Sequence, residues 1–241
     1  FAKNLANRTW AQFLGRGLVE PIDDVRMTNP PSNPALLDAL ARHVAEQKFD
    51  IKQLIRTMTA SRTYQLSSHA NSSNQHDEQN YSRALLRPLP AEVLFDAVCQ
   101  TTGVVEKFDG IPSGFRALQL WDSNVPHEFL KTFGRPARTS ACACERISEP
   151  NVAQVLKVMN SSLIQAKLTH VDGRVARWAR SNLADAALIE EMYLTFYSRP
   201  PEDTERTAAV NYLQQHANQR AAALEDLAWS LLNTTEFVFQ H

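Results

Sequence analysis

Two cysteines separated by a single residue form the most reactive pattern in this 241-residue chain. Cys142 and Cys144 stand in the run Ala-Cys-Ala-Cys-Glu-Arg. In an oxidising compartment such a pair forms a disulfide if the backbone turns between the two residues. The alternatives are buried free thiols, or a metal site that takes further ligands such as His127 or His170 from elsewhere. The third cysteine, Cys99, lies in an apolar segment and is expected to be a small core residue.

Charged and amide side chains cluster around a Gly15-x-Gly17 turn near the start of the chain. They are Asn7, Arg8, Arg16, Asp23, Asp24 and Arg26. Guanidinium groups and carboxylates in such a cluster could face a polar ligand, as in an anion or sugar site. The alternative is a network of ion pairs that fastens the loop between two helices. The sequence leaves both interpretations open.

A second group of charged and aromatic residues surrounds the cysteine pair. Its members are Trp121, Phe129, Phe133, Arg135, Arg138, Glu145, Arg146 and Glu149. The arginines could clamp a phosphate or sulfate and the rings could stack on sugars, whereas salt bridging and core packing are the alternatives. We predict weak binding of an acidic glycan through Arg135, Arg138 and Trp121, which weakens as salt rises.

Motifs for other kinds of chemistry are missing from the sequence. The seven histidines show no metal-binding spacing, and no Cys-x-x-Cys-His sequence for haem attachment occurs. Gly15-x-Gly17 is not a dinucleotide fingerprint, because Glu20 stands where the third glycine is needed. No metal or cofactor is therefore predicted, and whether the chain is an enzyme stays open.

Charge and hydropathy restrict the partners. A net charge of −1 gives no general attraction to nucleic acid. No apolar run approaches the roughly 18 residues that span a bilayer. The first residues resemble neither a signal peptide nor an anchor, so any export signal is expected upstream.

Helical periodicity dominates the apolar parts of the chain. Glycine is scarce, at 7 of 241 residues, which argues against a turn-rich β protein. Asn33 before Pro34, and Asp50 with Gln53, are typical helix N-terminal signals. The sequence therefore predicts a mainly α protein, with helices over about 3–14, 34–47, 51–62, 90–102, 152–163, 185–198, 201–217 and 221–233.

The middle of the chain is expected to be irregular. Short strands are expected only within 104–121, and residues 67–80, which lack large aliphatic side chains, are expected to form a polar loop. The stretches 103–121 and 134–150 carry Gly and Pro between short apolar islands. Functional residues on a helical scaffold usually lie on such loops.

One helical pattern occurs twice. The spacing aromatic-x-x-Phe-x-x-Arg that ends at Arg16 recurs near the other end of the chain, where it ends at Arg199, and an apolar block that ends at Tyr64 recurs with its end at Phe237. This is typical of a duplicated helical unit with a loop of variable length. We predict that the helices over 3–14, 34–47 and 51–62 superpose on those over 185–198, 201–217 and 221–234, with the two arginines in equivalent places.

Several motifs, in order, are similar to those of one family. They are Asn7-Arg8-x-Trp10, Phe13-x-Gly15-x-Gly17-Leu18-Val19, Pro31-Ser32-x-Pro34, Asn80-x-x-Arg83, Arg87-x-Leu89, Phe133-Gly134-Arg135-Pro136, Cys144-Glu145-Arg146 and Leu231-Leu232-Asn233. Over essentially its whole length the chain resembles the domain of unknown function 1553 family, which is abundant in planctomycetes and related bacteria. Asn33 stands where many members have His, and helix capping is the role that both types can share.

The resemblance implies a setting and no activity. Members are typically the C-terminal part of large exported proteins, often with a c-type cytochrome domain, in genomes rich in polysaccharide-degrading genes. It therefore implies an extracytoplasmic protein, periplasmic or in the cell envelope, with upstream domains of the same polypeptide as partners.

We expect a single domain over 1–241. Within it, related helical units at 1–66 and 183–241 enclose a polar loop at 67–83 and a central region at 84–182.

The predicted function is a non-catalytic binding or assembly module of a larger exported protein, linked to polysaccharides. The alternative is an enzyme of polysaccharide metabolism, hydrolytic or redox, with its site in the central loops from Gly103 to Pro150 and the cluster from Arg8 to Arg26. An enzyme would gather Asp, Glu, His or Cys in one pocket with shifted pKa values, whereas scattered, salt-bridged groups favour the module.

Overall fold

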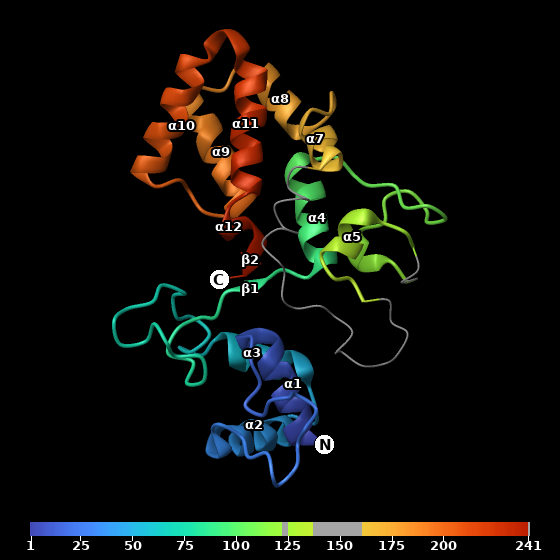
Figure 1. Ribbon diagram of the computed structural model, residues 1–241, viewed down its shortest axis with the longest axis vertical. Coiled ribbons are helices and arrows are strands. Elements are labelled where there is room, and N and C mark those ends of the chain that lie inside the picture. The colour runs from blue at the N-terminus through green and yellow to red at the C-terminus, as the bar shows by residue number, and fades with distance from the viewer. Residues whose placement is uncertain (122–124, 137–160, 241) are drawn as a thin grey trace. The chain divides into compact units, whose positions relative to one another are not determined.

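The computed structural model describes residues 1–121, 125–136 and 161–240. These residues form two compact units, residues 1–87 (unit 1) and 88–240 (unit 2). The regular secondary structure of both units is almost wholly helical (Figure 1), so the predicted mainly α class is confirmed. In the part of the chain that the structure describes, no helix is both long and apolar enough to cross a membrane.

Unit 1 begins with three helices that all contact one another: α1 (Ala2–Leu14), α2 (Pro34–Glu46) and α3 (Ile51–Thr59). The predicted N-caps are confirmed, since Asn33 accepts a hydrogen bond from the backbone N–H of Leu36 and Asp50 one from that of Gln53, both at 3.0 Å. Each cap satisfies an N–H that has no partner within its helix. The core of the unit consists of Ala6, Trp10, Leu14, Leu18, Val19, Leu37, Leu40, Val44, Leu54 and Met58.

A long polar loop follows α3 (Figure 1), and its fully described residues 67–83 contain no helix or strand. The carboxylate of Asp77 accepts the backbone N–H groups of Asn80 at 2.8 Å and Ser82 at 3.1 Å, and also the Ser82 hydroxyl. The hydrogen bonds from that hydroxyl and from Asn80 hold the pKa of Asp77 well below its usual range. Asn71 accepts two further backbone N–H groups. The loop is thus ordered by its own side-chain to backbone hydrogen bonds.

Unit 2 contains α-helices and short 3-10 turns. Those described are α4 (Ala91–Thr102), η1 (Ala117–Gln119), α5 (Glu128–Thr132), α7 (Ser162–Leu168), α8 (Arg174–Arg180), α9 (Asp185–Tyr197), α10 (Asp203–Gln215), η3 (Ala217–Gln219), α11 (Arg220–Leu232) and α12 (Thr235–Val238). A two-stranded sheet joins β1 (Arg87–Pro88), where the chain enters unit 2, to β2 (Phe239–Gln240).

The strands predicted within 104–121 are wrong, because this described segment contains η1 and no strand. The carboxylate of Asp96 accepts the backbone N–H groups of Ala117 at 2.7 Å and Leu118 at 3.2 Å, which holds a turn there. The helix predicted over 152–163 lies almost wholly outside the described residues, and α7 begins at Ser162.

Four short helices, α5, α7, α8 and α12, have no counterpart in the sequence prediction. None of them buries more than three residues, so their periodic signal is too short to recognise.

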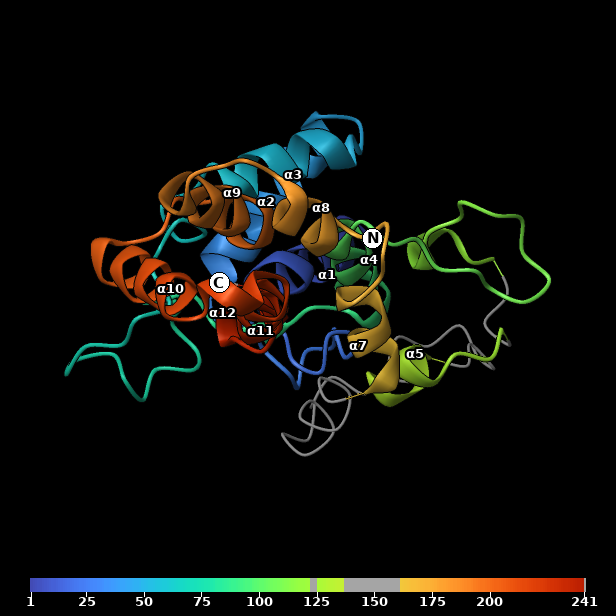
Figure 2. The ribbon, with the colours of Figure 1, turned by 90° about the horizontal axis from the view of Figure 1, so that it is seen from above.

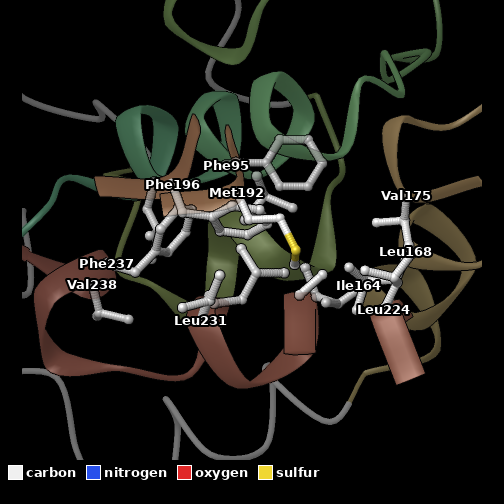
Figure 3. Packing of buried hydrophobic residues seen from close by; sticks show 14 of the residues in the cluster. Phe95, Ile164, Leu168, Val175, Met192, Phe196, Leu224, Leu231, Phe237 and Val238 are labelled. Carbon is white, nitrogen blue, oxygen red and sulfur yellow. The ribbon is translucent and has the colours of Figure 1, made fainter. Parts of the chain in front are cut away.

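The core of unit 2 draws on α4, α9, α11 and α12, among others. Figure 3 shows Phe95 of α4, Met192 and Phe196 of α9, Leu231 of α11 and Phe237 of α12 gathered in one cluster, and all five are buried. Burying a side chain of this size contributes roughly 1.5–3 kcal/mol. Helices far apart in the sequence are therefore joined through their apolar faces.

The helical trios α1–α3 and α9–α11 have similar helix caps at corresponding positions of the repeated sequence pattern. The second trio is seen in Figures 1 and 2. α1 ends at Gly15 with a φ of 87° and α9 ends at Ser198 with a φ of 58°, both left-handed. Each cap N–H donates to the carbonyl four residues back, at 2.9 Å and 3.1 Å. After α3 and α11, the hydroxyls of Ser61 and Thr234 accept the N–H three residues ahead, at 3.2 Å in both cases.

The aromatic contacts correspond as well. The rings of Phe13 and Tyr64 lie 6.3 Å apart between centroids, and those of Phe196 and Phe237 lie 5.9 Å apart. The two pairs occupy corresponding positions in the two copies of the sequence pattern. The caps and ring pairs thus agree with a repeat, and superposition of the whole trios stays a prediction.

Candidate functional site

A buried amide holds the turn that follows α1. Asn7, which has no exposed surface, donates to the carbonyl oxygens of Val19 at 3.0 Å and Ile22 at 3.2 Å and accepts the Val19 N–H at 2.9 Å. A Cβ at Gly17 would lie 2.5 Å from the Val19 carbonyl oxygen, so only glycine allows the backbone to approach this closely. The turn is therefore fixed to α1.

Tyr81, at the end of the polar loop, fastens the same turn from a second side. Its hydroxyl lies 3.1 Å from the Arg16 carbonyl oxygen and 2.9 Å from that of Gly17, and its ring meets Trp10 edge-on. The φ of Tyr81 is 55°, a conformation that costs a non-glycine residue roughly 1–3 kcal/mol. Burial raises the pKa of Tyr81, so the hydroxyl stays a donor at neutral pH. Backbone strain of this kind clusters at functional sites.

A cavity of about 720 Å³ lies beside this turn in unit 1. It is lined by Gly15, Arg16, Glu20, Glu78, Arg83, Leu85, Leu86 and Arg87. Three arginines and two glutamates thus line one cavity. We call it the arginine pocket.

Two of its three guanidinium groups form no ion pair within the described ranges. Nη1 of Arg16 lies 3.5 Å from the carbonyl oxygen of Glu78, and Nε of Arg83 lies 3.4 Å from that of Asn74. Both are long contacts to neutral acceptors. No carboxylate oxygen among the described residues approaches either guanidinium within 4 Å. Both side chains are half-buried, and both residues line the pocket.

The third arginine is committed to the helix. Arg87 donates from Nη2 to the Phe13 carbonyl oxygen at 2.6 Å and from Nη1 to that of Gln12. These carbonyls end α1, where a positive charge is favourable. Burial lowers the pKa of Arg87. A Cβ at Gly15 would lie 2.5 Å from Cδ of Arg87, which with its φ of 87° makes glycine the fitting residue.

The lining contains groups that can bind anions and hydroxyls. Glu20 accepts the Gly17 N–H at 2.5 Å. Guanidinium groups bind planar anions such as carboxylates through paired hydrogen bonds. Glu78 is exposed and can accept hydroxyl hydrogens of a sugar.

The counterpart arginine of the second trio is fully engaged. Arg199 donates to Glu236 from Nε at 2.6 Å and from Nη2 at 2.8 Å, and to Glu205 from Nη1 at 2.8 Å and from Nη2 at 2.9 Å. The rings of Tyr193 and Tyr197 lie 5.6 Å and 5.4 Å from its guanidinium carbon. Nη1 also donates to the Pro200 carbonyl oxygen at 3.1 Å, so all five N–H groups of Arg199 are used and connect α9, α10 and α12.

The other residues predicted in this cluster pair with one another. Arg8 forms an ion pair with Asp23, and Arg26 forms one with Asp24 at 2.7 Å. These four residues therefore form ion pairs, as the second interpretation of the cluster predicts. Arg16, in contrast, lines the pocket.

The residues predicted around the cysteine pair are only partly described. The side chain of Arg135 is 8% exposed and lies 3.9 Å from Glu92, so it does not face solvent. Trp121 is 63% exposed and its ring packs edge-on against Phe115. Arg138, Cys142 and Cys144 lie outside the described residues, so the disulfide stays a prediction.

Titratable groups also gather around Phe95 in unit 2. Lys167, 4% exposed, pairs with Glu106 at 2.8 Å and lies over the Phe95 ring. Burial lowers the pKa of His127 and raises the pKa of Cys99 to about 11. A thiol with a raised pKa is a poor nucleophile, so this cluster has the character of a structural network. Among the described residues no three His, Cys, Asp or Glu side chains could hold a metal ion.

Sequence reasoning missed most of the pocket. Tyr81, Arg83 and Arg87 lie far from Arg16 along the chain and belong to the irregular segment at the end of the polar loop. The available signal was their place within Asn80-x-x-Arg83 and Arg87-x-Leu89, two motifs shared with the resembled family. No spacing rule joins them to α1.

Fold and site together define a mainly helical protein with an arginine-rich pocket at a helix end. A family model described as "Protein of unknown function (DUF1553)" matches residues 1–213, so the chain belongs to this family, and the resemblance seen in the motifs is confirmed. No curated protein and no solved structure matches the chain.

Proposed function

We propose that this chain is a non-catalytic binding module of a larger exported protein and that its arginine pocket binds an anionic group of a glycan, a carboxylate or a sulfate. The observation that carries the proposal is that Arg16 lines a cavity and forms no ion pair with the described residues. Its counterpart Arg199 is neutralised by two carboxylates, whereas Arg16 and Arg83 line a cavity without an ion pair among the described residues. An extracytoplasmic setting, upstream domains and a link to polysaccharides are part of the proposal and rest on the family resemblance.

The contact residues differ from those expected from the sequence. Arg135 is nearly buried beside Glu92, so we assign the anion to Arg16 and Arg83, with Glu78 accepting sugar hydroxyls. Partly buried guanidinium groups are less screened than exposed ones, which favours them as anion ligands.

The test is a titration of the intact chain with oligogalacturonate, a heparin oligosaccharide and neutral dextran, followed by calorimetry at low and high salt. We expect the two acidic glycans to bind, more weakly at high salt, and dextran not to bind. Replacing both Arg16 and Arg83 by Ala should weaken binding at least about tenfold, because hydrogen bonds to charged groups contribute roughly 1.5–3 kcal/mol each.

The matched control is the double variant Arg56→Ala with Arg62→Ala, which removes the same charge from exposed positions of unit 1. If both double variants bind alike, the contact is only general electrostatic attraction. Release of reducing ends or of sulfate by the intact chain, lost on changing a single Asp, Glu or Cys, would instead establish the enzyme.

A further inference from the structure

A second cavity, of about 500 Å³, lies among α9, α10 and α11 of unit 2. Its floor is apolar and includes Ile189, Met192, Leu227 and Leu231. Its volume falls in the range of roughly 300–1,000 Å³ that small-molecule sites occupy. Its lining differs from that of the arginine pocket, because it contains no arginine or lysine. We call it the helical pocket.

Small side chains on α10 leave this space open. Ala209 is 7% exposed and belongs to the core of unit 2. A methyl group fills less of the space between packed helices than a larger apolar side chain would. Ala208 and Ala209 both line the helical pocket.

The polar groups at the pocket carry a negative charge that the described part of the protein does not neutralise. Asp226 accepts the Tyr212 hydroxyl at 2.9 Å, and no Lys or Arg nitrogen among the described residues lies within 4 Å of its carboxylate. The other carboxylate of the lining, Glu205, is paired with Arg199. A carboxylate without a cationic partner, beside a tyrosine ring and an apolar floor, complements a cation that carries an apolar group.

From this lining we infer that the helical pocket binds a small ligand with one ammonium group on an apolar body about the size of a benzene ring. The body would pack on Ile189, Met192 and Leu227, and the ammonium would meet Asp226 and the face of Tyr212. The inference is independent of the arginine pocket and of the glycan that we assign to it.

Three probes with one body and different head groups test the inference: 4-phenylbutylamine, 4-phenylbutan-1-ol and 4-phenylbutyrate. Binding to the intact chain is followed by ligand-observed NMR titration. The amine should bind about fivefold more tightly than the alcohol, in line with an ion pair to the exposed carboxylate of Asp226, and the acid should bind most weakly. Asp226→Asn should remove the preference for the amine and keep binding of the alcohol.

Ala209→Leu should fill the pocket, because Ala209 lines it, and should abolish binding of all three probes. Ala187→Leu, at an exposed position of α9, is the matched control and should bind like the unmodified chain. Circular dichroism reports whether each variant is folded, and the head-group series with Asp226→Asn decides the question if Ala209→Leu does not fold.

Three results would overturn the inference. They are equal binding of the three probes, unchanged binding to a folded Ala209→Leu variant, and no saturable binding of the amine at about 10 mM. Light scattering covers one more outcome: a dimer that Ala209→Leu converts to a monomer would assign the hollow to contact between two copies of the chain and would also overturn the inference.

Discussion

Arg16 and Arg199 hold corresponding positions in the repeated sequence pattern, yet their surroundings differ. Arg199 is held by two carboxylates and two tyrosine rings, whereas Arg16 lines a cavity and makes one long contact to a neutral acceptor. The two trios also differ in packing, since a cavity lies among α9, α10 and α11 of the second trio. Two copies of one sequence pattern thus differ in a few side chains, and these determine whether the arginine is neutralised.

The largest expected effect is a difference in the free energy of unfolding between the Arg199 and Arg16 variants. Arg199→Ala leaves Glu205 and Glu236 partly buried without their cation and should lower the free energy of unfolding by roughly 2–4 kcal/mol. Arg16→Ala should change it by no more than about 0.5 kcal/mol. Urea unfolding measures both, and equal losses would show that Arg16 is structural as well.

A carboxylate introduced beside Arg16 would make its surroundings resemble those of Arg199. Because Tyr64 corresponds to Phe237 in the repeated pattern, Thr63 corresponds to Glu236, and Thr63→Glu should place a carboxylate within reach of Arg16. We expect binding of oligogalacturonate to fall about tenfold, since the new carboxylate competes with the ligand for the guanidinium. Thr63→Gln, equal in size and neutral, is the control, and a similar loss in both variants would contradict the equivalence.

Substitutions at the two left-handed caps, Gly15 and Ser198, should change stability by smaller amounts and in opposite directions. Gly15→Ala should destabilise the chain by roughly 1–2 kcal/mol, because a Cβ is strained at a φ of 87° and meets Arg87. Ser198→Gly should stabilise it by about 1 kcal/mol, because glycine adopts a φ of 58° without that strain. Thermal unfolding monitored by circular dichroism measures both, and a loss of stability with Ser198→Gly would show that the serine side chain is needed.

The smallest expected effect is the pH dependence that the ion pair of Arg199 with Glu205 gives to the second trio. The Arg199 hydrogen bonds lower the pKa of Glu205 below its unfolded value of 4.5, so its stabilising contribution is complete above that pH. It is lost as pH falls through the folded pKa, by up to about 1 kcal/mol after screening. The urea midpoint between pH 7 and pH 3 should fall less in Glu205→Gln than in the unmodified chain, and parallel curves would refute the assignment.

Local signals predicted the helices and part of one site. The helices that bury a long apolar face appear close to where periodicity predicts them, with Asn33 and Asp50 as caps. Short helices such as α8 carry too few buried residues to give a period. The strands expected near 104–121 fail because a single carboxylate, Asp96, holds a turn there.

The arginine pocket could not be predicted from local sequence signals. Its arginines come from positions 16, 83 and 87, which are joined by a polar loop rather than by any periodic element. The hydrogen bonds of Tyr81 to the turn after α1 help to bring them together, and such a contact leaves no pattern in the sequence. The charge cluster from Arg8 to Arg26 was visible, but which of its members would pair depended on geometry.

The hydrogen bonds of the polar loop have a consequence for the kinetics of binding. Asp77 and Asn71 order the loop through hydrogen bonds within it, and Glu78 and Arg83 lie within the loop or at its end. A site that is already ordered loses little conformational entropy when it is occupied. Association is then limited by diffusion and by the attraction between charges, rather than by folding of the loop. Encounter should therefore be fast and should slow steeply as ionic strength rises.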